Sequence, residues 1–472
     1  MRVIGKQEPA AAPPWPEAAV RKALGLPGEG EGRTFVRIST DTRLIEQGSL
    51  FVALGGERFD GHDFLVAAAK AGAAAAVVRA GTSAVAGLSL LEVPDTLRAF
   101  GALAHARRLT IPGPVIAVTG TNGKTSTKEM LAAALSTRYV TYATRANLNN
   151  LVGVPLTILE APEGTEALVV EAGANIPGEI ARYREIIAPR AVVVTNAVAG
   201  HLEGFGSLDG VVEEKLSLAE GADLAVVGVE PPALASGARQ RARRVRTAAL
   251  EGADLVPDAV DLDAEARPVL TIGGIRFTLA ARGLHQADNA MRVWAVAEEL
   301  GLEMRAVAEA LERFTLPGGR GELLQVGQLT ILDDCYNANP QSFRAAMATA
   351  RRLRRGRRLV FVAGTMRELG THSTALHSQI ARELVDLEPE LLAAVGEFVG
   401  ALEPYREALG DRLVTAPDPP ALAPVLSDRL RGDEVVVLKA SRGVALERIL
   451  PALAALAGRQ VAAEPSPGID TR

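Results

Sequence analysis

The chain is poor in cysteine, in aromatic residues and in excess charge. One cysteine, Cys335, occurs among 472 residues, so no intrachain disulfide can form, and we expect a reducing compartment. Aromatic residues make up 4% of the chain, which disfavours a surface that binds nucleic acid by stacking on bases. The net charge of −5 also disfavours such a partner, because dedicated nucleic-acid-binding proteins are usually basic.

Long hydrophobic runs are absent as well. No stretch of about 18 uncharged apolar residues occurs, and residues 1–16 contain no apolar segment of the signal-peptide kind. We therefore expect a cytoplasmic protein without a membrane partner. At roughly 100–200 residues per domain, the length predicts about two to four domains, large enough to fold without disulfides or structural metal.

Lysine is rare in a chain that otherwise uses arginine. The sequence holds 44 arginines but only seven lysines. Of the two side chains, only the lysine amine loses its proton readily, so a retained lysine indicates a position where amine chemistry matters. Lys124, Lys215 and Lys439 are the candidates.

Two segments that break the pattern divide the chain. Residues 112–114 read Pro-Gly-Pro and residues 316–319 read Leu-Pro-Gly-Gly, as at domain boundaries. Elsewhere short apolar runs alternate with helical runs, which is typical of βαβ units. The prediction is an α/β protein of three domains: a smaller N-terminal α/β domain (1–110), a central domain with a mostly parallel, doubly wound sheet (111–316), and a Rossmann-like C-terminal domain (317–460), with a tail at 461–472. Strands are predicted at 50–54, 73–78, 115–118, 167–170, 191–194, 224–227, 329–332, 359–362, 392–395 and 434–438, and a helix at 63–71.

A glycine-rich segment between a predicted strand and a predicted helix carries the sharpest signal. In G-x-x-G-K-T, glycines let backbone N–H groups turn toward an anion, the lysine can reach the β- and γ-phosphates, and the threonine hydroxyl can reach Mg²⁺. Val118 stands where the usual Walker pattern has its first glycine, so the loop is short. The segment predicts a nucleotide-phosphate site without specifying the reaction. Its residues are Gly120, Thr121, Asn122, Gly123, Lys124, Thr125 and Ser126.

Acidic and imidazole side chains follow two other predicted strands. Glu171 comes directly after the strand at 167–170, and His201 lies in the loop after the strand at 191–194. In doubly wound sheets ligands bind at the carboxyl ends of strands, and Mg²⁺ prefers oxygen ligands. A buried ion-pair partner is the alternative for Glu171, and a surface-loop histidine is the alternative for His201. Both alternatives stay open on the sequence.

The C-terminal block repeats this arrangement. The strand at 329–332 ends in residues 333–340, Asp-Asp-Cys-Tyr-Asn-Ala-Asn-Pro, and the strand at 434–438 ends in Lys439 and residues 440–443, Ala-Ser-Arg-Gly. Loops on α/β scaffolds often carry function, although helix capping would also explain the paired aspartates. Nothing beside Cys335 reads as a base, so its expected role is structural.

Together these motifs resemble the Mur ligases, ATP-dependent enzymes that add amino acids to the bacterial cell-wall precursor. Residues 120–125 are similar to the ATP loop of that family, and the resemblance extends over about residues 30 to 450. It is strongest to the branch that adds D-alanyl-D-alanine. The stretches that carry this are 333–340, 171–175 with 178–180, and 59–64, whereas the D-N-P-R motif of the diaminopimelate-adding branch is absent.

The resemblance implies a reaction and its participants. It implies ATP-dependent joining of D-alanyl-D-alanine to UDP-N-acetylmuramoyl-tripeptide through an acyl phosphate, giving ADP, phosphate and the UDP-muramyl-pentapeptide of peptidoglycan synthesis. ATP and Mg²⁺ would be the cofactors of a monomer that binds small-molecule substrates and neither nucleic acid nor membrane. The alternatives are another Mur or folylpolyglutamate-type ligase, and a P-loop nucleotide switch; residues 333–340 favour the first reading.

The resemblance also implies roles for single residues. Lys124, Glu171, His201 and Lys215 would be catalytic, with Lys215 carbamylated to N6-carboxylysine, which requires a neutral amine. Thr125, Glu171 and His201 would hold the metal. Outside the phosphate loop, ATP would contact Asn289, Arg320, Asp334, Tyr336 and Asn337. The other substrates would contact Thr42, Arg43, Phe59, Asp60, Gly61, His62, Asn149, Lys439, Ser441 and Arg442.

Some positions depart from the family pattern. Thr42 replaces a serine, Gln286 an asparagine, Cys335 a serine and Ala440 a glycine, while Thr365 replaces a common aspartate and removes a charge. Because water would destroy an acyl phosphate, we expect the domains to close before chemistry, by hinge motion at about residues 110–114 and 316–319.

Overall fold

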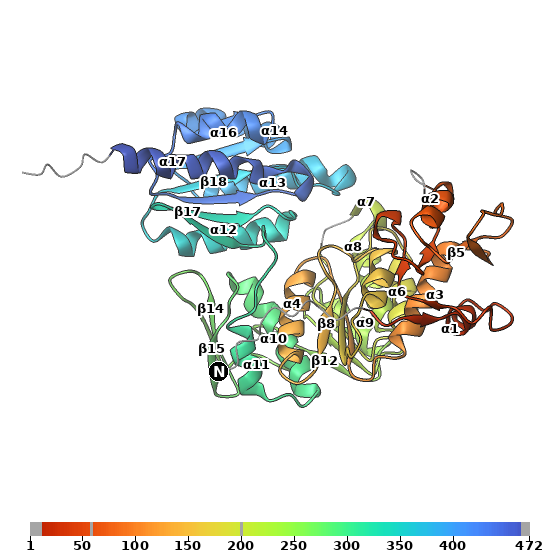
Figure 1. The fold of residues 1–472 in the computed structure, drawn as a ribbon. Coiled ribbons are helices and arrows are strands. Elements are labelled where there is room, and N and C mark those ends of the chain that lie inside the picture. Colours follow the sequence, from red (N-terminus) through yellow and green to blue (C-terminus); the bar gives the residue numbers. More distant parts are fainter. Residues whose placement is uncertain (1–11, 57–59, 199–201, 464–472) are drawn as a thin grey trace, which may run out of the picture.

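The computed structural model describes residues 12–56, 60–198 and 202–463, which form three α/β domains (Figure 1). The N-terminal and C-terminal domains lie on either side of the central domain. This confirms the predicted fold class; the predicted borders at residues 110 and 316 stay predictions. Among the helices in the described ranges, none combines the length and apolar character needed to cross a bilayer.

The central sheet has six parallel strands in the order β12-β11-β10-β7-β9-β8. From β7 the chain runs to one side of the sheet through β8 and β9, and to the other side from β10 onward. The carboxyl end of β7 is therefore a topological switch point, where a crevice opens in such sheets. The strands are β7 (Val115–Thr119), β8 (Thr141–Ala143), β9 (Ala167–Glu171), β10 (Ala191–Val194), β11 (Leu224–Val227) and β12 (Val245–Thr247).

Helices cover both faces of this sheet. In β7, Val115 and Ala117 join one apolar core, and Ile116 and Val118 join another on the opposite face, together with α4 and α10. This two-sided burial explains why the strands are continuous apolar runs. The helices are α4 (Lys124–Leu135), α5 (Gly153–Leu159), α6 (Glu179–Ile187), α7 (Leu202–Phe205), α8 (Leu208–Leu216), α9 (Pro232–Arg239), α10 (Leu284–Glu299) and α11 (Met304–Leu311). A small antiparallel sheet, which was not predicted, precedes α10: β13 (Ala259–Leu262), β14 (Pro268–Ile272) and β15 (Ile275–Thr278).

The N-terminal domain has a four-stranded parallel sheet in the order β3-β4-β5-β6. The predicted helix at 63–71 begins as a 3₁₀ turn, Gly61–Phe64, and continues as α2 up to Lys70, close to Gly72 at φ +103°. The last helix, α3, packs on α5 and α6 of the central domain. The elements are β1 (Trp15–Pro16), α1 (Glu17–Ala23), β2 (Thr34–Phe35), β3 (Ile38–Ser39), β4 (Leu50–Val52), α2 (Leu65–Lys70), β5 (Ala75–Arg79), β6 (Ser89–Val93) and α3 (Thr96–Arg108).

The C-terminal sheet has the order β16-β17-β21-β18-β19-β20, with β16 antiparallel to its neighbour and the others parallel. β17 and β21 are neighbours, so their carboxyl ends meet. The strands are β16 (Glu322–Val326), β17 (Leu329–Asp334), β18 (Leu359–Ala363), β19 (Leu391–Val395), β20 (Leu413–Ala416) and β21 (Val435–Lys439). The helices are α12 (Pro340–Arg354), α13 (Ser373–Asp386), α14 (Glu397–Leu402), α15 (Arg406–Leu409), α16 (Pro419–Ser427) and α17 (Leu450–Ala463).

Candidate active site

A cleft of about 390 Å³ lies between the phosphate loop of the central domain and the start of α12 in the C-terminal domain. It brings together most of the predicted site residues from these two domains. Those that line it are Thr121, Asn122, Gly123, Lys124, Thr125, Ser126, Asn149, Glu171, Asn289, Arg320, Asp334, Tyr336, Asn337 and Lys439.

The phosphate loop makes a tight turn from β7 into α4. Gly120 and Gly123 have φ of +142° and +80°, and a side chain at Gly123 would collide with Asn289. No side chain caps the start of α4, so the first-turn N–H groups have neither a capping side chain nor a partner within the helix. The Lys124 ammonium lies 2.8 Å from the carbonyl oxygen of Gly120 and 2.9 Å from that of Thr121. Such a loop suits a phosphate group.

Glu171 is a buried carboxylate that contacts the phosphate loop through Thr125. It ends β9, next to β7, and is 2% exposed. Its Oε2 accepts a hydrogen bond of 2.8 Å from the Thr125 hydroxyl, and its Oε1 accepts one of 2.8 Å from Asn149 Nδ2. Among the described residues its side-chain hydrogen bonds come from neutral donors, while burial lowers the pKa of the Lys124 amine and the charge of Glu171 opposes that lowering. The ion-pair alternative therefore stays open.

The donor set around Glu171 fits Mg²⁺. A carboxylate, a hydroxyl and an amide oxygen are hard ligands, and Mg²⁺ usually keeps waters and substrate phosphates as its remaining ligands. No group of three His, Cys, Asp or Glu side chains that could hold a metal by itself occurs in residues 12–56, 60–198 and 202–463. A metal ion here would need water or phosphate oxygens as further ligands. His201, the third predicted metal ligand, lies outside the described residues.

Lys215 is buried on α8 beside, rather than within, the lining of the cleft. It is 1% exposed, and its ammonium is 5.3 Å from the centroid of the Phe205 ring. Burial, followed by the charge of Lys124, lowers the pKa of Lys215 to about 7, against the opposing effect of Glu214 and Glu179. A large share of this amine is therefore neutral near pH 7, the form that carbamylation requires.

Asn289 closes the cleft at the start of α10. It is 3% exposed, packs against Gly123, and donates to Gln286 Oε1 at 3.2 Å. Gln286 thus supplies an acceptor that orients the Asn289 amide, so its departure from the family pattern keeps a polar partner for that side chain.

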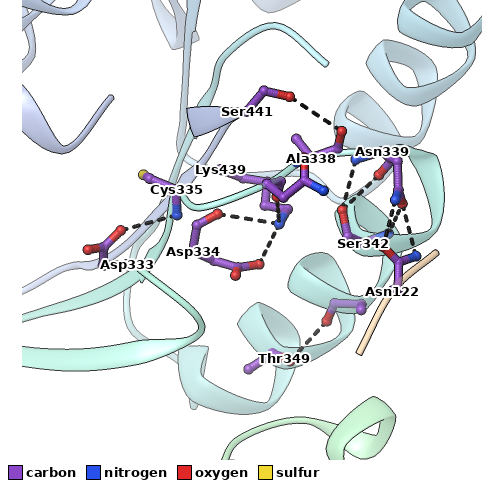
Figure 2. Close-up of polar contacts among 12 residues, drawn as sticks. Asn122, Asp333, Asp334, Cys335, Ala338, Asn339, Ser342, Thr349, Lys439 and Ser441 are labelled. Carbon is purple, nitrogen blue, oxygen red and sulfur yellow. Dashed lines mark hydrogen bonds and ion pairs between the residues drawn. The ribbon is translucent and has the colours of Figure 1, made fainter. Parts of the chain in front are cut away.

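The loop after β17 is anchored by a lysine from β21 (Figure 2). Lys439, 2% exposed, lies 2.7 Å from Asp334 Oδ2 and donates to the carbonyl oxygen of Asn337 at 2.6 Å. Arg320 stacks on Tyr336, with 3.6 Å between the guanidinium carbon and the ring centroid. Asp334, Tyr336 and Asn337 are therefore held as one wall of the cleft.

Cys335 and Thr365 are structural in this arrangement. Cys335 is 1% exposed, and burial together with the neighbouring Asp333 carboxylate raises the pKa of its thiol, so it is a poor nucleophile. The Thr365 hydroxyl accepts a hydrogen bond of 3.0 Å from the backbone N–H of Glu397 at the start of α14. The position that often carries aspartate here supports a helix end instead.

Two predicted substrate residues lie outside the lining of the cleft. The Ser441 hydroxyl accepts from the backbone N–H of Arg367 at 2.9 Å and so ties two loops of the C-terminal domain together. Arg442 is exposed and lies 3.2 Å from Glu447.

The predicted substrate residues of the N-terminal domain form two polar turns away from the cleft. Arg43 pairs with Asp41 and holds the pKa of that carboxyl at about 2, mainly through its side-chain hydrogen bond. His62 Nε2 accepts from the backbone N–H of Arg79 at 2.9 Å, so its Nδ1 donates to Asp60, 2.5 Å away. Thr42 and Gly61 lie in the same turns, and Phe59 lies outside the described residues.

Amide side chains were missed by sequence reasoning. Asn196, Asn339 and Gln341 all contact Asn122 of the phosphate loop, and the last two belong to the other domain. Asn339 lies in the stretch 333–340 but was assigned no role, whereas Asn196 and Gln341 carry no signal of their own. A contact between residues more than 200 positions apart depends on how the domains pack.

Similarity to known proteins agrees with this geometry. Three domain families match the chain: "Mur ligase family, catalytic domain" at residues 34–108, "Mur ligase middle domain" at 118–297 and "Mur ligase, glutamate ligase domain" at 319–442. The UDP-N-acetylmuramoyl-tripeptide–D-alanyl-D-alanine ligase of Bacillus subtilis is 33% identical over 88% of this chain and 92% of its own length. The chain belongs to the Mur ligase family.

Solved structures extend this likeness to the whole fold of this Mur ligase. MurF from Acinetobacter baumannii superposes with a TM-score of 0.84 at 29% identity, covering 94% of this chain and 99% of that chain. MurF ligase from Thermotoga maritima, solved in complex with ADP, gives a TM-score of 0.79 at 27% identity, covering 90% and 98%. The three-domain architecture is therefore that of the family.

Proposed function

We propose that this Mur ligase joins D-alanyl-D-alanine to UDP-N-acetylmuramoyl-tripeptide at the expense of ATP. One observation carries the proposal: Asp334, Tyr336 and Asn337, from the stretch that marks this branch, line the same cleft as the phosphate loop. The curated Bacillus subtilis relative that bears this activity in its name supports it, and so does the ADP complex of the Thermotoga maritima relative.

The phosphate loop and Glu171 serve the first step. The N–H groups at the start of α4 bind the phosphates of ATP, and Lys124 places a positive charge beside the transferring group. Thr125 and Glu171 would hold Mg²⁺, with His201 as a further ligand; when bound, Mg²⁺ neutralises charge on the phosphates. The γ-phosphoryl group moves to the terminal carboxylate of the tripeptide, which turns a poor electrophile into an acyl phosphate.

The second step forms the amide. The amine of D-alanyl-D-alanine attacks the carbonyl carbon of the acyl phosphate, the C–O bond to phosphate breaks, and phosphate leaves. Lys439, Ser441 and Arg442 would hold the carboxylate end of the dipeptide. ATP would be held by Asn289, Arg320, Asp334, Tyr336 and Asn337. Closure of the C-terminal domain over the cleft would exclude the water that otherwise destroys the intermediate.

A carbamylated Lys215 is part of this proposal. A lysine pKa near 7 supports it, since CO₂ reacts with the neutral amine. The product is an anion beside Lys124, which would position that lysine or a metal ion. In the N-terminal domain, Thr42, Arg43, Asp60, Gly61 and His62, with Phe59, would bind the UDP group. A monomer that acts in the cytoplasm completes the proposal.

Phosphate release tests the function. ATP, Mg²⁺, UDP-muramyl-tripeptide and D-alanyl-D-alanine are supplied together and then omitted one at a time. We expect release only with all four, and a pentapeptide product by mass spectrometry. Release with a single amino acid but not with the dipeptide would move the chain to another branch of the family. Release that needs no acceptor would favour the nucleotide-switch alternative.

A further inference from the structure

Asn122, in the phosphate loop, is held from two domains at once. Within the central domain its backbone N–H donates to Asn196 Oδ1 at 3.0 Å, and its carbonyl oxygen accepts from the Thr195 hydroxyl at 2.5 Å. Both partners follow β10, so the backbone of the loop is tied to the strand beside β7.

The side chain of Asn122 reaches into the C-terminal domain instead (Figure 2). Its Nδ2 donates to Gln341 Oε1 at 2.7 Å and to Asn339 Oδ1 at 3.2 Å, and its Oδ1 accepts from Asn339 Nδ2 at 2.6 Å. Both the donor and the acceptor group of this amide are thus used by the other domain.

The partner side of this contact is rigid. Asn339 is the N-cap of α12: its Oδ1 accepts from the Ser342 N–H at 2.9 Å, and the Ser342 hydroxyl accepts from the Asn339 N–H at 2.9 Å. Such a capping box fixes the orientation of the residue that carries it. Asp334, Tyr336 and Asn337, which line the cleft, come shortly before Asn339 in the chain, so we expect the contact and that wall of the cleft to move together.

We propose that Asn339 and Gln341 are positioning residues, which lock the phosphate loop into its phosphate-binding geometry only when the C-terminal domain is closed. Both residues act through Asn122, although Gln341 also lines the cleft. The contact is neutral, so closure can be sensed beside the phosphates of ATP without adding charge there. This rests on the proposed function only because phosphate transfer is the step that the lock would serve.

Domain closure can be measured without the ligase reaction. Val140 in the central domain and Val425 on α16 are 60% and 45% exposed, and Cys335 is buried, so Val140→Cys with Val425→Cys gives a dye pair for single-molecule energy transfer. Gln341→Met removes the acceptor at similar length. Gln379→Met, at an exposed position on α13, is the matched control. We measure the closed fraction with and without ATP and Mg²⁺, and the KM for ATP in phosphate release.

We expect Gln341→Met to lower the closed-to-open ratio about two- to tenfold, the scale of one neutral hydrogen bond. The KM for ATP should rise by a similar factor, with the melting temperature unchanged, and Gln379→Met should match the parent. Gln341→Glu keeps an oxygen that accepts from Asn122 Nδ2. Without nucleotide, its closed fraction should therefore equal that of the parent.

Two results would overturn the inference. One is a closed fraction and an ATP KM that Gln341→Met leaves unchanged. The other is full additivity of Asn122→Ala and Gln341→Met, because residues that act through one contact must couple. If closure responds as expected but the reaction accepts another amino acid, the proposed function fails and the inference stands.

Discussion

The central domain meets its two neighbours through interfaces of opposite character. Toward the N-terminal domain the interface is apolar, and one core runs through both domains, from Phe35 and Phe100 to Tyr183 and Val170. Two arginines at the end of α3 reach across it. Arg107 donates to the carbonyl oxygens of Ala161 and Pro162, and Arg108 to those of Ile187 and Ala188 at the end of α6.

Toward the C-terminal domain the contacts are mainly polar. The C-terminal domain has its own apolar cores. Of the described residues of the central domain, only Ala266 belongs to one of them. α12 makes the connection. Asn339 and Gln341 at its start hydrogen-bond to Asn122 of the phosphate loop. Arg352 near its end donates to the carbonyl oxygens of Leu262 and Asp263. Polar contacts exchange with water at a small net cost, whereas separating an apolar core exposes its whole area.

The difference between the two interfaces indicates which linker can act as a hinge. We expected motion near residues 110–114 and 316–319, but the shared core opposes motion at the first segment. Its Gly113 N–H also donates to the carbonyl oxygen of Glu166 at 2.9 Å, which ties the linker to the central sheet. We therefore expect closure of the cleft to occur mainly at the second segment, with the N-terminal and central domains moving as one body; both hinges stay predictions.

The largest effect should come from Glu171 in the cleft, where a substitution should lower activity strongly and leave stability nearly unchanged. Glu171→Gln removes the charge beside Thr125 and keeps the shape, so we expect turnover to fall about 100- to 1000-fold, the range for loss of one preorganised electrostatic group. The free energy of unfolding should change by less than about 1 kcal/mol, because the amide oxygen still accepts a hydrogen bond. Phosphate release and urea unfolding check this. Glu309→Gln, exposed on α11, is the control; turnover within tenfold of the parent would remove Glu171 from the reaction.

The apolar interface should show the reverse. Arg108→Ala leaves the carbonyl oxygens of Ile187 and Ala188 without their charged donor, each now 2.7 Å from the guanidinium. We expect unfolding to be easier by about 2–4 kcal/mol, with turnover of the folded enzyme unchanged. Arg98→Ala, exposed on the same helix, controls for the loss of charge. If Arg108→Ala lowers turnover without lowering stability, the two domains are not the single rigid body inferred here.

Lys215 is buried beside the cleft, and its lowered pKa should make the stability of the protein depend on pH. The amine keeps its proton up to about pH 10.5 when unfolded and only to about pH 7 when folded. Between these values the unfolded chain binds more protons, so this group makes stability rise with pH, by at most about 1.4 kcal/mol per pH unit. Lys215→Met removes that slope. In CO₂-free buffer the variant should be more stable than the parent at pH 7, with the gap narrowing toward pH 9; parallel stability curves would contradict a buried, neutral amine.

Buried features could be predicted from the sequence, and features that depend on packing between segments could not. The strands β7, β9, β10 and β11 were predicted because strands buried on both faces are continuous apolar runs. Edge strands such as β8, β12 and β20, and the half-exposed β13, carry no such run and were missed. The phosphate loop and Glu171 were predicted for a related reason, since a local motif and its place after a strand determine where they lie.

The rest of the site depends on domain contacts. Nothing local to Gln341 distinguishes it from other amides, and Asn339 was assigned no role although it lies in the stretch 333–340. Their contact with Asn122 appears only when α12 is placed on the phosphate loop. The roles expected for Ser441, Arg442 and the turns of the N-terminal domain came from resemblance, and they stay predictions because these residues lie away from the lining of the cleft.

The smallest effect should come from the far end of the rigid body. Arg43 is exposed and paired with Asp41, so Arg43→Ala should leave unfolding unchanged, since exposed ion pairs add little to stability. If Arg43 binds the UDP-linked substrate, its KM should rise about three- to tenfold, the loss of one screened, charge-assisted contact, while the KM for ATP stays constant. Arg313→Ala, an exposed and ion-paired arginine on α11, is the control. A parallel rise in the KM for ATP would mean that the N-terminal turn influences the cleft through the shared core, and the contrast between a structural and a functional interface would no longer hold.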